Sequence, residues 1–197
     1  MLTRVLPHEF YRSVCVVALL ISAACVTIRV AGPEVTTVYL VRHGEKSTAD
    51  VNDPNPTLTP AGRARAGALA VKLANAGVTH IISTQWMRTR ETAQPLASLL
   101  GLTTEIVPST VSGFADSTAA AVRRHRGETI LVVGHSNTIA SVIAALGGPR
   151  VPDLCDSEHS NLFVMKITKS PGPSLVREHY GTMDPAPDSA CIAMRAK

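Results

Sequence analysis

Short apolar runs alternate with longer amphipathic segments along most of this chain. The apolar runs are rich in β-branched residues, which is typical of buried strands, and they predict strands at residues 35–41, 79–82, 104–107 and 129–133. The segments between them predict helices at residues 60–76, 87–100, 118–125 and 138–146. This alternation indicates an α/β fold with three αβα layers, in which helices cover both faces of a mostly parallel sheet.

The C-terminal third of the chain adds a different pattern. Residues 161–168 and 174–180 are predicted to pair as a hairpin across a Pro-Gly-Pro turn, which gives the sheet an antiparallel edge. From Gly181 the chain is Pro-rich, and we expect it to be irregular. Pro95 is expected to kink or divide its helix. The pattern therefore predicts one domain over residues 32–180 and a tail over residues 181–197.

The first 31 residues differ from the rest. Arg4 and Arg12 precede an apolar run at residues 14–28, which is the order of an export signal. The run is about 15 residues long, shorter than the roughly 20 that span a bilayer. Small residues before Cys25 offer a cleavage site, although lipidation of Cys25, an uncleaved anchor and a buried helix are alternatives. We expect an exported protein, periplasmic or anchored to a membrane only through this segment.

The amino-acid composition suits a single domain and argues against a nucleic-acid-binding function. The length of 197 residues suits one domain with a core of useful size. Aromatic residues make up only 4%, and removing residues 1–31 lowers the formal charge from +4 to +2. Neither a base-stacking surface nor a basic stripe is indicated, so we expect no nucleic-acid partner. Cys155 and Cys191 then remain, and in an oxidising compartment they could form one disulfide that holds the tail, with two buried thiols as the alternative.

Cationic side chains follow three of the predicted strands. Arg42 and His43 come directly after the first strand, Arg88 follows the second, and His135 follows the fourth. Right-handed crossovers bring the carboxyl ends of parallel strands to one edge of a sheet, which is where ligands bind. Guanidinium groups match phosphoryl oxygens in geometry and charge, and a neutral imidazole can act as a nucleophile. The sequence thus predicts a phosphate site with a nucleophilic histidine.

Three segments resemble the motifs of the histidine phosphatase superfamily, which includes the cofactor-dependent phosphoglycerate mutases. They are LVRHGE at 40–45, STQWMRTRETA at 83–93 and VGHSNT at 133–138, and the resemblance covers roughly residues 35–168. It implies a phosphoglycerate mutase-like fold. It also implies a phosphatase that hydrolyses a phosphomonoester, or phosphohistidine, without a cofactor. The expected partner is a small phosphorylated substrate or a phosphoprotein.

The resemblance also implies roles for individual side chains. His43 would attack phosphorus and carry the phosphoryl group until water releases it. The side chains implied to hold the phosphoryl oxygens or lie next to them are Arg42, Arg88, His135, Ser136 and Asn137. This scheme requires a neutral His43 and a His135 that stays protonated beside a phosphate dianion. No metal ion is needed, because the cationic side chains take the role that Mg²⁺ fills in kinases.

A general acid is harder to identify from the motifs. An alkoxide leaving group needs a proton, which relatives often take from a carboxylate. The residue after His135 is a serine, so that arrangement is absent. Asp116, in a predicted loop 28 positions beyond Arg88, is the candidate, although it equally suits a helix cap. Without an acid, the substrate would need a good leaving group, such as phosphohistidine itself.

Two other functions are alternatives to a phosphatase. Only 46 residues separate Arg88 from His135, whereas mutases of the superfamily usually carry a longer insertion there, so a mutase-type phosphotransferase is the first alternative. A noncatalytic phosphate-binding protein is the second, although a pure binder needs no nucleophile such as His43. Residues 155–159 include metal-capable side chains, but no second cluster has zinc-site spacing, so no metal site is expected. Selectivity is expected in the loops at 45–58 and 108–118.

Overall fold

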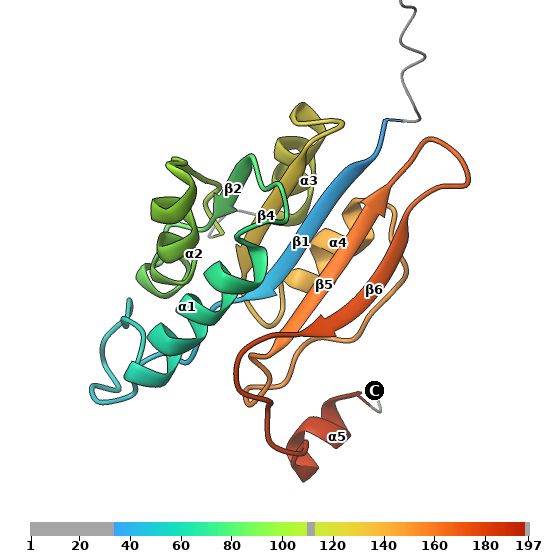
Figure 1. Cartoon of the computed structure of the whole chain (residues 1–197). Helices are drawn as coiled ribbons and strands as arrows, with labels where there is room; N and C mark the ends of the chain where they lie inside the picture. Colours follow the sequence, from blue (N-terminus) through green and yellow to red (C-terminus); the bar gives the residue numbers. More distant parts are fainter. Residues whose placement is uncertain (1–33, 110–112, 196–197) are drawn as a thin grey trace, which may run out of the picture. The chain divides into compact units, whose positions relative to one another are not determined.

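A six-stranded mixed sheet forms the centre of the computed structural model, which describes residues 34–109 and 113–195 (Figure 1). Its strands are β1 (Thr36–Arg42), β2 (His80–Ser83), β3 (Thr104–Ile106), β4 (Thr129–Gly134), β5 (Asn161–Ile167) and β6 (Ser174–His179). Their order is β3-β2-β4-β1-β5-β6. The first four are parallel, whereas β5 runs antiparallel to β1 and β6 antiparallel to β5. The predicted parallel sheet with an antiparallel edge is confirmed.

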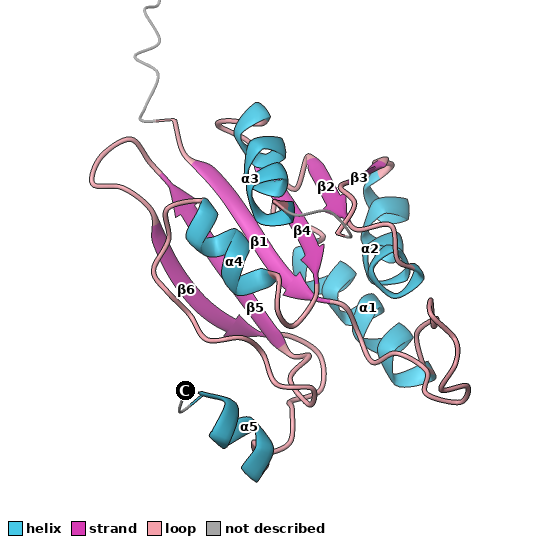
Figure 2. Cartoon of the chain, turned by 180° about the vertical axis from the view of Figure 1, so that it is seen from behind, coloured by secondary structure: helices cyan, strands magenta, loops and turns pink. Residues whose placement is uncertain are grey.

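Helices cover both faces of this sheet, so the predicted three layers are also confirmed. Helices α1 (Pro60–Leu73) and α2 (Met87–Leu100) lie on one face, and α3 (Phe114–Arg124) and α4 (Ile139–Ala145) lie on the other (Figures 1 and 2). Each pair buries its own apolar cluster: Leu69 and Leu96 belong to one, and Val122 and Ile143 to the other. Burial on both faces explains why the central strands are continuous apolar runs.

Local signals set most helix ends. Thr59 caps α1 by accepting a hydrogen bond from Gly62 N at 3.0 Å, and Pro60 follows it as the first helical residue. Gly101 ends α2 with a φ of 66°. Of the two outcomes expected at Pro95, a kink or a division of the helix, the division is wrong, because α2 runs unbroken through Pro95. The fully buried Leu96 beside it packs in the core, and this packing offsets the one hydrogen bond that proline removes.

Helix α3 begins four residues earlier than predicted. Gly113, with a φ of 86°, precedes Phe114, whose side chain is buried in the core cluster with Val122. This packing extends the helix toward its N-terminus. Asp116 therefore lies in the first turn of α3 and not in a preceding loop, and a negative charge at that position is favourable to the helix dipole.

The C-terminal tail is not wholly irregular, so that expectation is wrong for its last described residues. Helix α5 spans Ser189–Arg195, and Asp188 accepts a hydrogen bond from Cys191 N at 2.7 Å at its start. A disulfide joins Cys191 to Cys155, with 5.4 Å between their Cα atoms. The bond fixes α5 to the segment that follows α4.

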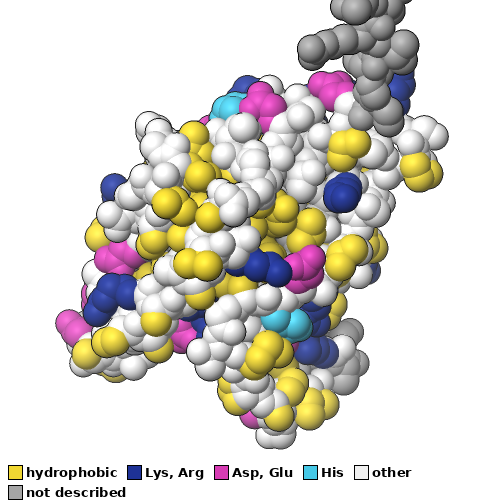
Figure 3. Space-filling model, viewed as in Figure 1, with side chains coloured by type: hydrophobic (Ala, Val, Ile, Leu, Met, Phe, Trp, Pro, Cys, Tyr) yellow, Lys and Arg dark blue, Asp and Glu magenta, His cyan; other side chains and the backbone are white. Residues whose placement is uncertain are grey.

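The predicted leader at residues 1–31 lies outside the described residues. Within residues 34–109 and 113–195, no helix is both long and apolar enough to cross a membrane. On the face that α1 and α2 cover, charged side chains of both signs are interspersed with apolar ones among the residues drawn in colour (Figure 3).

Candidate active site

The parallel pairing of β1 and β4 brings two histidines together. Arg42 lies opposite Gly134 in the register, so both strands end at the same level. The residues that follow are His43 and His135, whose ring centroids are 5.3 Å apart. His43 N also donates a hydrogen bond to Gly134 O at 3.0 Å, which ties the two strand ends to each other.

A cavity of about 530 Å³ opens at this edge of the sheet. It is lined by every side chain that the sequence argument placed around the phosphate: Arg42, His43, Arg88, His135, Ser136 and Asn137. Thr48 and Ser109, from the two loops expected to set selectivity, line it as well. Asp116 is exposed and is not among the described residues that line the cavity.

His43 is neutral and has a defined tautomer. Its Nδ1 lies 2.7 Å from the carbonyl oxygen of Gly44, and a carbonyl only accepts, so Nδ1 carries the proton. Burial lowers the pKa of His43 to about 2, and the positive charges of Arg42 and Arg88 act in the same direction. The lone pair of Nε2 is thus available to a ligand in the cavity.

His135 is also neutral when the cavity holds no anion. Burial lowers its pKa to about 4, with a further contribution from Arg88 and Arg42. Its Nε2 lies 3.1 Å from Thr84 Oγ1, a neighbour that the sequence argument did not identify. The protonated form of His135 that the sequence-based scheme requires is therefore expected only when phosphate is bound. A dianion in the cavity raises the pKa of a neighbouring imidazole, because it favours the charged form.

Arg42 is held from behind by the segment that follows α4. Its Nη1 donates to the carbonyl oxygens of Cys155 at 2.6 Å and Asp156 at 3.1 Å, and its Nη2 donates to Asp156 Oδ1 at 3.3 Å. The Nε of Arg42 is buried and has no hydrogen-bond partner among the described residues. A buried donor without a partner is costly, so an anion that accepted from Nε would stabilise this arrangement.

Arg88 supplies the second guanidinium from the first turn of α2. It lies over the ring of Trp86, at 5.1 Å from the centroid, and Trp86 in turn donates from Nε1 to Ser109 Oγ at 2.9 Å. Trp86 therefore forms part of the cavity wall. Burial lowers the pKa of Arg88, and no carboxylate within the described part of the chain pairs with it. Its charge is thus available to a ligand.

His159 is a third cavity histidine that the sequence argument missed. Its ring centroid lies 6.0 Å from that of His43, and its Nδ1 donates to the carbonyl oxygen of His43 at 2.9 Å. Burial lowers the pKa of His159, and the charge of Arg42 adds to the effect. The two histidines are 116 positions apart, and no local motif marks His159. From the sequence, residues 155–159 were considered only as metal-capable side chains.

The carboxylates that line the cavity are both paired with arginines. Glu45 accepts from Arg65 Nη2 at 2.7 Å. Burial alone would raise the pKa of Glu45, but the hydrogen bonds from Arg65 outweigh it and hold the pKa below its ordinary value. Asp156 accepts from Arg42, as described above. Glu45 is therefore an ionised group with an orienting role, not a proton donor.

Part of this chain is similar in sequence to known proteins. A sequence model of the histidine phosphatase superfamily (branch 1) matches residues 38–110, which hold Arg42, His43 and Arg88. The "Probable phosphoglycerate mutase GpmB" of Yersinia pestis is 40% identical over 70 residues, or 34% of this chain and 33% of that protein. The alignment thus spans about a third of the length of this curated relative.

Solved structures share the fold over more of the chain. The protein histidine phosphatase SixA, solved in complex with tungstate, superimposes with a TM-score of 0.58 and 17% identity, covering 73% of this chain and 96% of SixA. A phosphoserine phosphatase from Entamoeba histolytica, in complex with 3-phosphoglyceric acid, gives a TM-score of 0.56 and 17% identity, covering 75% and 98%. At these identities the likeness establishes the fold alone.

Proposed function

We propose that this chain is a member of the histidine phosphatase superfamily, whose sequence model matches residues 38–110, and that it hydrolyses phosphomonoesters or phosphohistidine through a phosphohistidine intermediate on His43. The observation that carries the proposal is the state of His43. It is neutral, its Nδ1 proton is held by the Gly44 carbonyl, and its Nε2 is unprotonated beside two guanidinium groups. A nucleophile with cationic groups around it suits an anionic, electrophilic phosphoryl group.

In the first step, His43 Nε2 attacks phosphorus and the bond from phosphorus to the leaving oxygen breaks. The cationic groups of Arg42, Arg88 and protonated His135 stabilise the negative charge that spreads over the other three oxygens of the phosphoryl group. A phosphoryl oxygen also provides the missing partner of Arg42 Nε. In the second step, water attacks the phosphohistidine and inorganic phosphate leaves.

The leaving oxygen receives its proton from His159 in this proposal. With Nδ1 bound to the His43 carbonyl, His159 has Nε2 left for proton transfer. This nitrogen takes up a proton when the phosphate dianion binds, gives it to the leaving oxygen, and regains one from the attacking water. Protons balance over the cycle. Asp116, the candidate from sequence, is less well placed because it does not line the cavity.

Two variants separate these proton donors. His159→Gln should slow the hydrolysis of an alkyl phosphate by about a hundredfold, within the range for general acids, and flatten the pH profile of kcat/KM. Hydrolysis of p-nitrophenyl phosphate, whose leaving group needs less protonation, should fall less. Asp116→Asn should leave both rates near the wild-type values. A slow Asp116→Asn variant together with a His159→Gln variant near the wild-type rate would instead identify Asp116 as the proton donor.

The intermediate is tested by turnover of p-nitrophenyl phosphate by the purified full-length chain in excess chelator, beside His43→Ala. We expect turnover in the chelator, none in the variant, and an acid-labile phosphoenzyme after a rapid quench. Activity that survived in His43→Ala would overturn the mechanism. A single burst without turnover would support a phosphate-binding protein in place of an enzyme.

A phosphoglycerate mutase is the second candidate, because the matched curated relatives carry that name. The two activities differ in their products from 3-phosphoglycerate. A phosphatase releases inorganic phosphate, whereas a mutase moves the phosphoryl group and releases almost none. The short segment between Arg88 and His135 supports the phosphatase, since it leaves less chain to enclose a substrate that must reorient.

Export through residues 1–31 completes the proposal, with a small phosphorylated substrate or a phosphoprotein outside the cytoplasm. The Cys155–Cys191 disulfide supports it, since such bonds persist in oxidising compartments. The mass of the protein recovered from the periplasmic and membrane fractions of the cell tests this part, and recovery from the cytoplasmic fraction alone would refute export. The intact chain, a chain shortened by about the leader, and a chain lipidated at Cys25 are distinguished by mass.

A further inference from the structure

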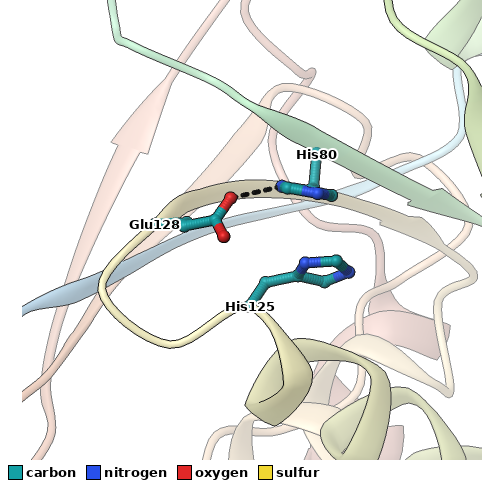
Figure 4. Close-up of side chains that lie close together, drawn as sticks. All are labelled: His80, His125 and Glu128. Atoms are coloured by element: carbon teal, nitrogen blue, oxygen red, sulfur yellow. Dashed lines mark ion pairs between the residues drawn. The ribbon is translucent and has the colours of Figure 1, made fainter.

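Two histidines and a glutamate form a cluster at the edge of the sheet opposite the cavity. His80 is the first residue of β2, His125 ends α3, and Glu128 immediately precedes β4 (Figure 4). The cavity lies beyond the other ends of the parallel strands, after Arg42 and Gly134. The proposed reaction makes no use of this cluster.

The chain path brings the three side chains together. Between α3 and β4, Gly127 adopts a φ of 78°, and Glu128 N donates to His125 O at 3.2 Å, which closes a tight turn. On the other side, Thr79 N donates to Thr129 O at 2.9 Å, and this places His80 beside Glu128. Backbone hydrogen bonds thus set the positions of all three side chains.

The three side chains lie close enough to share an ion but contact one another in the structure, and Thr79 Oγ1 also donates to Glu128 Oε2 at 3.0 Å. His80 Nδ1 lies 2.7 Å from Glu128 Oε2, and the rings of His80 and His125 are stacked with centroids 3.6 Å apart (Figure 4). One nitrogen or oxygen from each residue lies within 4.8 Å of the other two. A tetrahedral ion with bonds of about 2.0–2.1 Å needs its ligand atoms about 3.3–3.4 Å apart. An ion would therefore have to separate His80 Nδ1 from Glu128 Oε2 and part the stacked rings, and the partial exposure of all three side chains leaves them room to rotate.

A neighbouring carboxylate would orient one of the rings. Glu105 Oε2 lies 3.7 Å from His125 Nε2, and Glu105 is itself held by Arg124. Histidines that bind a metal commonly direct their second ring nitrogen to a carboxylate, which fixes the tautomer. This leaves Nδ1 of His125 on the side of an ion.

The donor set selects the kind of ion. Two imidazoles and one carboxylate suit Zn²⁺ and similar divalent transition ions, whereas Mg²⁺ and Ca²⁺ prefer oxygen ligands. We infer that His80, His125 and Glu128 form a Zn²⁺ site, with a water molecule as the fourth ligand. The ion would join the start of β2, the end of α3 and the start of β4. It would lie far along the strands from the reacting groups and take no part in the proposed hydrolysis, and its binding would stabilise these three segments against unfolding.

The test is Zn²⁺ binding to the full-length chain after chelator treatment, measured by calorimetry at neutral pH. We expect a site of one Zn²⁺ per chain, and at least a tenfold weaker affinity in each of His80→Ala, His125→Ala and Glu128→Gln. His179→Gln, which removes a histidine outside the cluster, should bind like the wild type. Zn²⁺ should also raise the Tm of the wild type and not of the cluster variants.

Cobalt distinguishes this site from the cavity histidines. Co²⁺ in place of Zn²⁺ should give the visible absorption of a tetrahedral site, lost in His125→Ala and kept in His43→Ala. Loss in His43→Ala alone would assign the ion to the cavity and overturn the inference, as would the absence of Zn²⁺ binding. Circular dichroism of each variant shows whether it is folded. A misfolded alanine variant is replaced by the corresponding glutamine, which must weaken binding as stated.

Discussion

Replacing both cysteines of the disulfide should weaken the fold and slow the proposed reaction together. The bond between Cys155 and Cys191 closes a segment of sequence separation 36 that includes β5 and β6. The same Cys155 provides the carbonyl oxygen that accepts from Arg42 Nη1 at 2.6 Å. Cys155→Ser/Cys191→Ser therefore perturbs the unfolded ensemble and the anchor of a phosphate-binding guanidinium.

The loss in the free energy of unfolding follows from the length of the segment that the disulfide closes. Loop-closure entropy for a segment of this size corresponds to about 4 kcal/mol at 25 °C. For a domain of this size, such a loss lowers the Tm by about 8–16 °C. A loosened Arg42 should cost about tenfold in kcat/KM, equivalent to about 1.4 kcal/mol of transition-state stabilisation.

Differential scanning calorimetry and p-nitrophenyl phosphate turnover measure the two effects on the same preparation. The matched control is treatment with dithiothreitol, which breaks the same bond without a substitution: it should lower both quantities in the wild type and leave the Cys155→Ser/Cys191→Ser variant unchanged. An unchanged Tm in the Cys155→Ser/Cys191→Ser variant would contradict the stabilising role. A lower Tm with unchanged kcat/KM would show that Arg42 does not depend on this anchor.

Three further predictions concern the site and the helix beside it. Below pH 6.5 the free energy of unfolding should fall as the pH falls, by up to about 1.4 kcal/mol per pH unit for each of His43 and His135. The reason is that the unfolded imidazoles bind protons, whereas the buried ones, with pKa values of about 2 and about 4, do not. Urea unfolding at several pH values that gave a flat profile would refute this. Gly62→Ala should destabilise the protein, because the added Cβ would lie 2.3 Å from the backbone oxygen of Glu45. Gly67→Ala in the same helix meets nothing within 4 Å and should raise the free energy of unfolding by up to about 1 kcal/mol, and equal shifts in Tm for the two variants would contradict the packing argument. Thr84→Val removes the hydroxyl partner of His135 and should lower kcat/KM by tenfold or more, and wild-type rates of phosphate release would show that this hydrogen bond is dispensable.

Local sequence patterns determined the elements of the fold and the centre of the site. Runs of β-branched residues identified the strands, and Thr59 with Pro60 identified the start of α1. Because parallel strands end at one edge, the motifs after three strands were enough to bring His43 and His135 together. These inferences depend only on periodicity, capping and the direction of strands, which neighbouring residues encode.

Contacts between distant segments decided the rest. His159 reaches the cavity across 116 positions, and Thr84 reaches His135 across 51, without any motif that marks either residue. The extension of α3 that carries Asp116 depends on the burial of Phe114 in the core. The protonation states of the histidines likewise depend on burial and on nearby arginines, quantities that exist only when the chain is folded. Sequence alone therefore brought the residues of the three motifs to one sheet edge. The tertiary structure added His159 and Thr84 to them and decided which groups are charged, which are anchored and which lie outside the cavity.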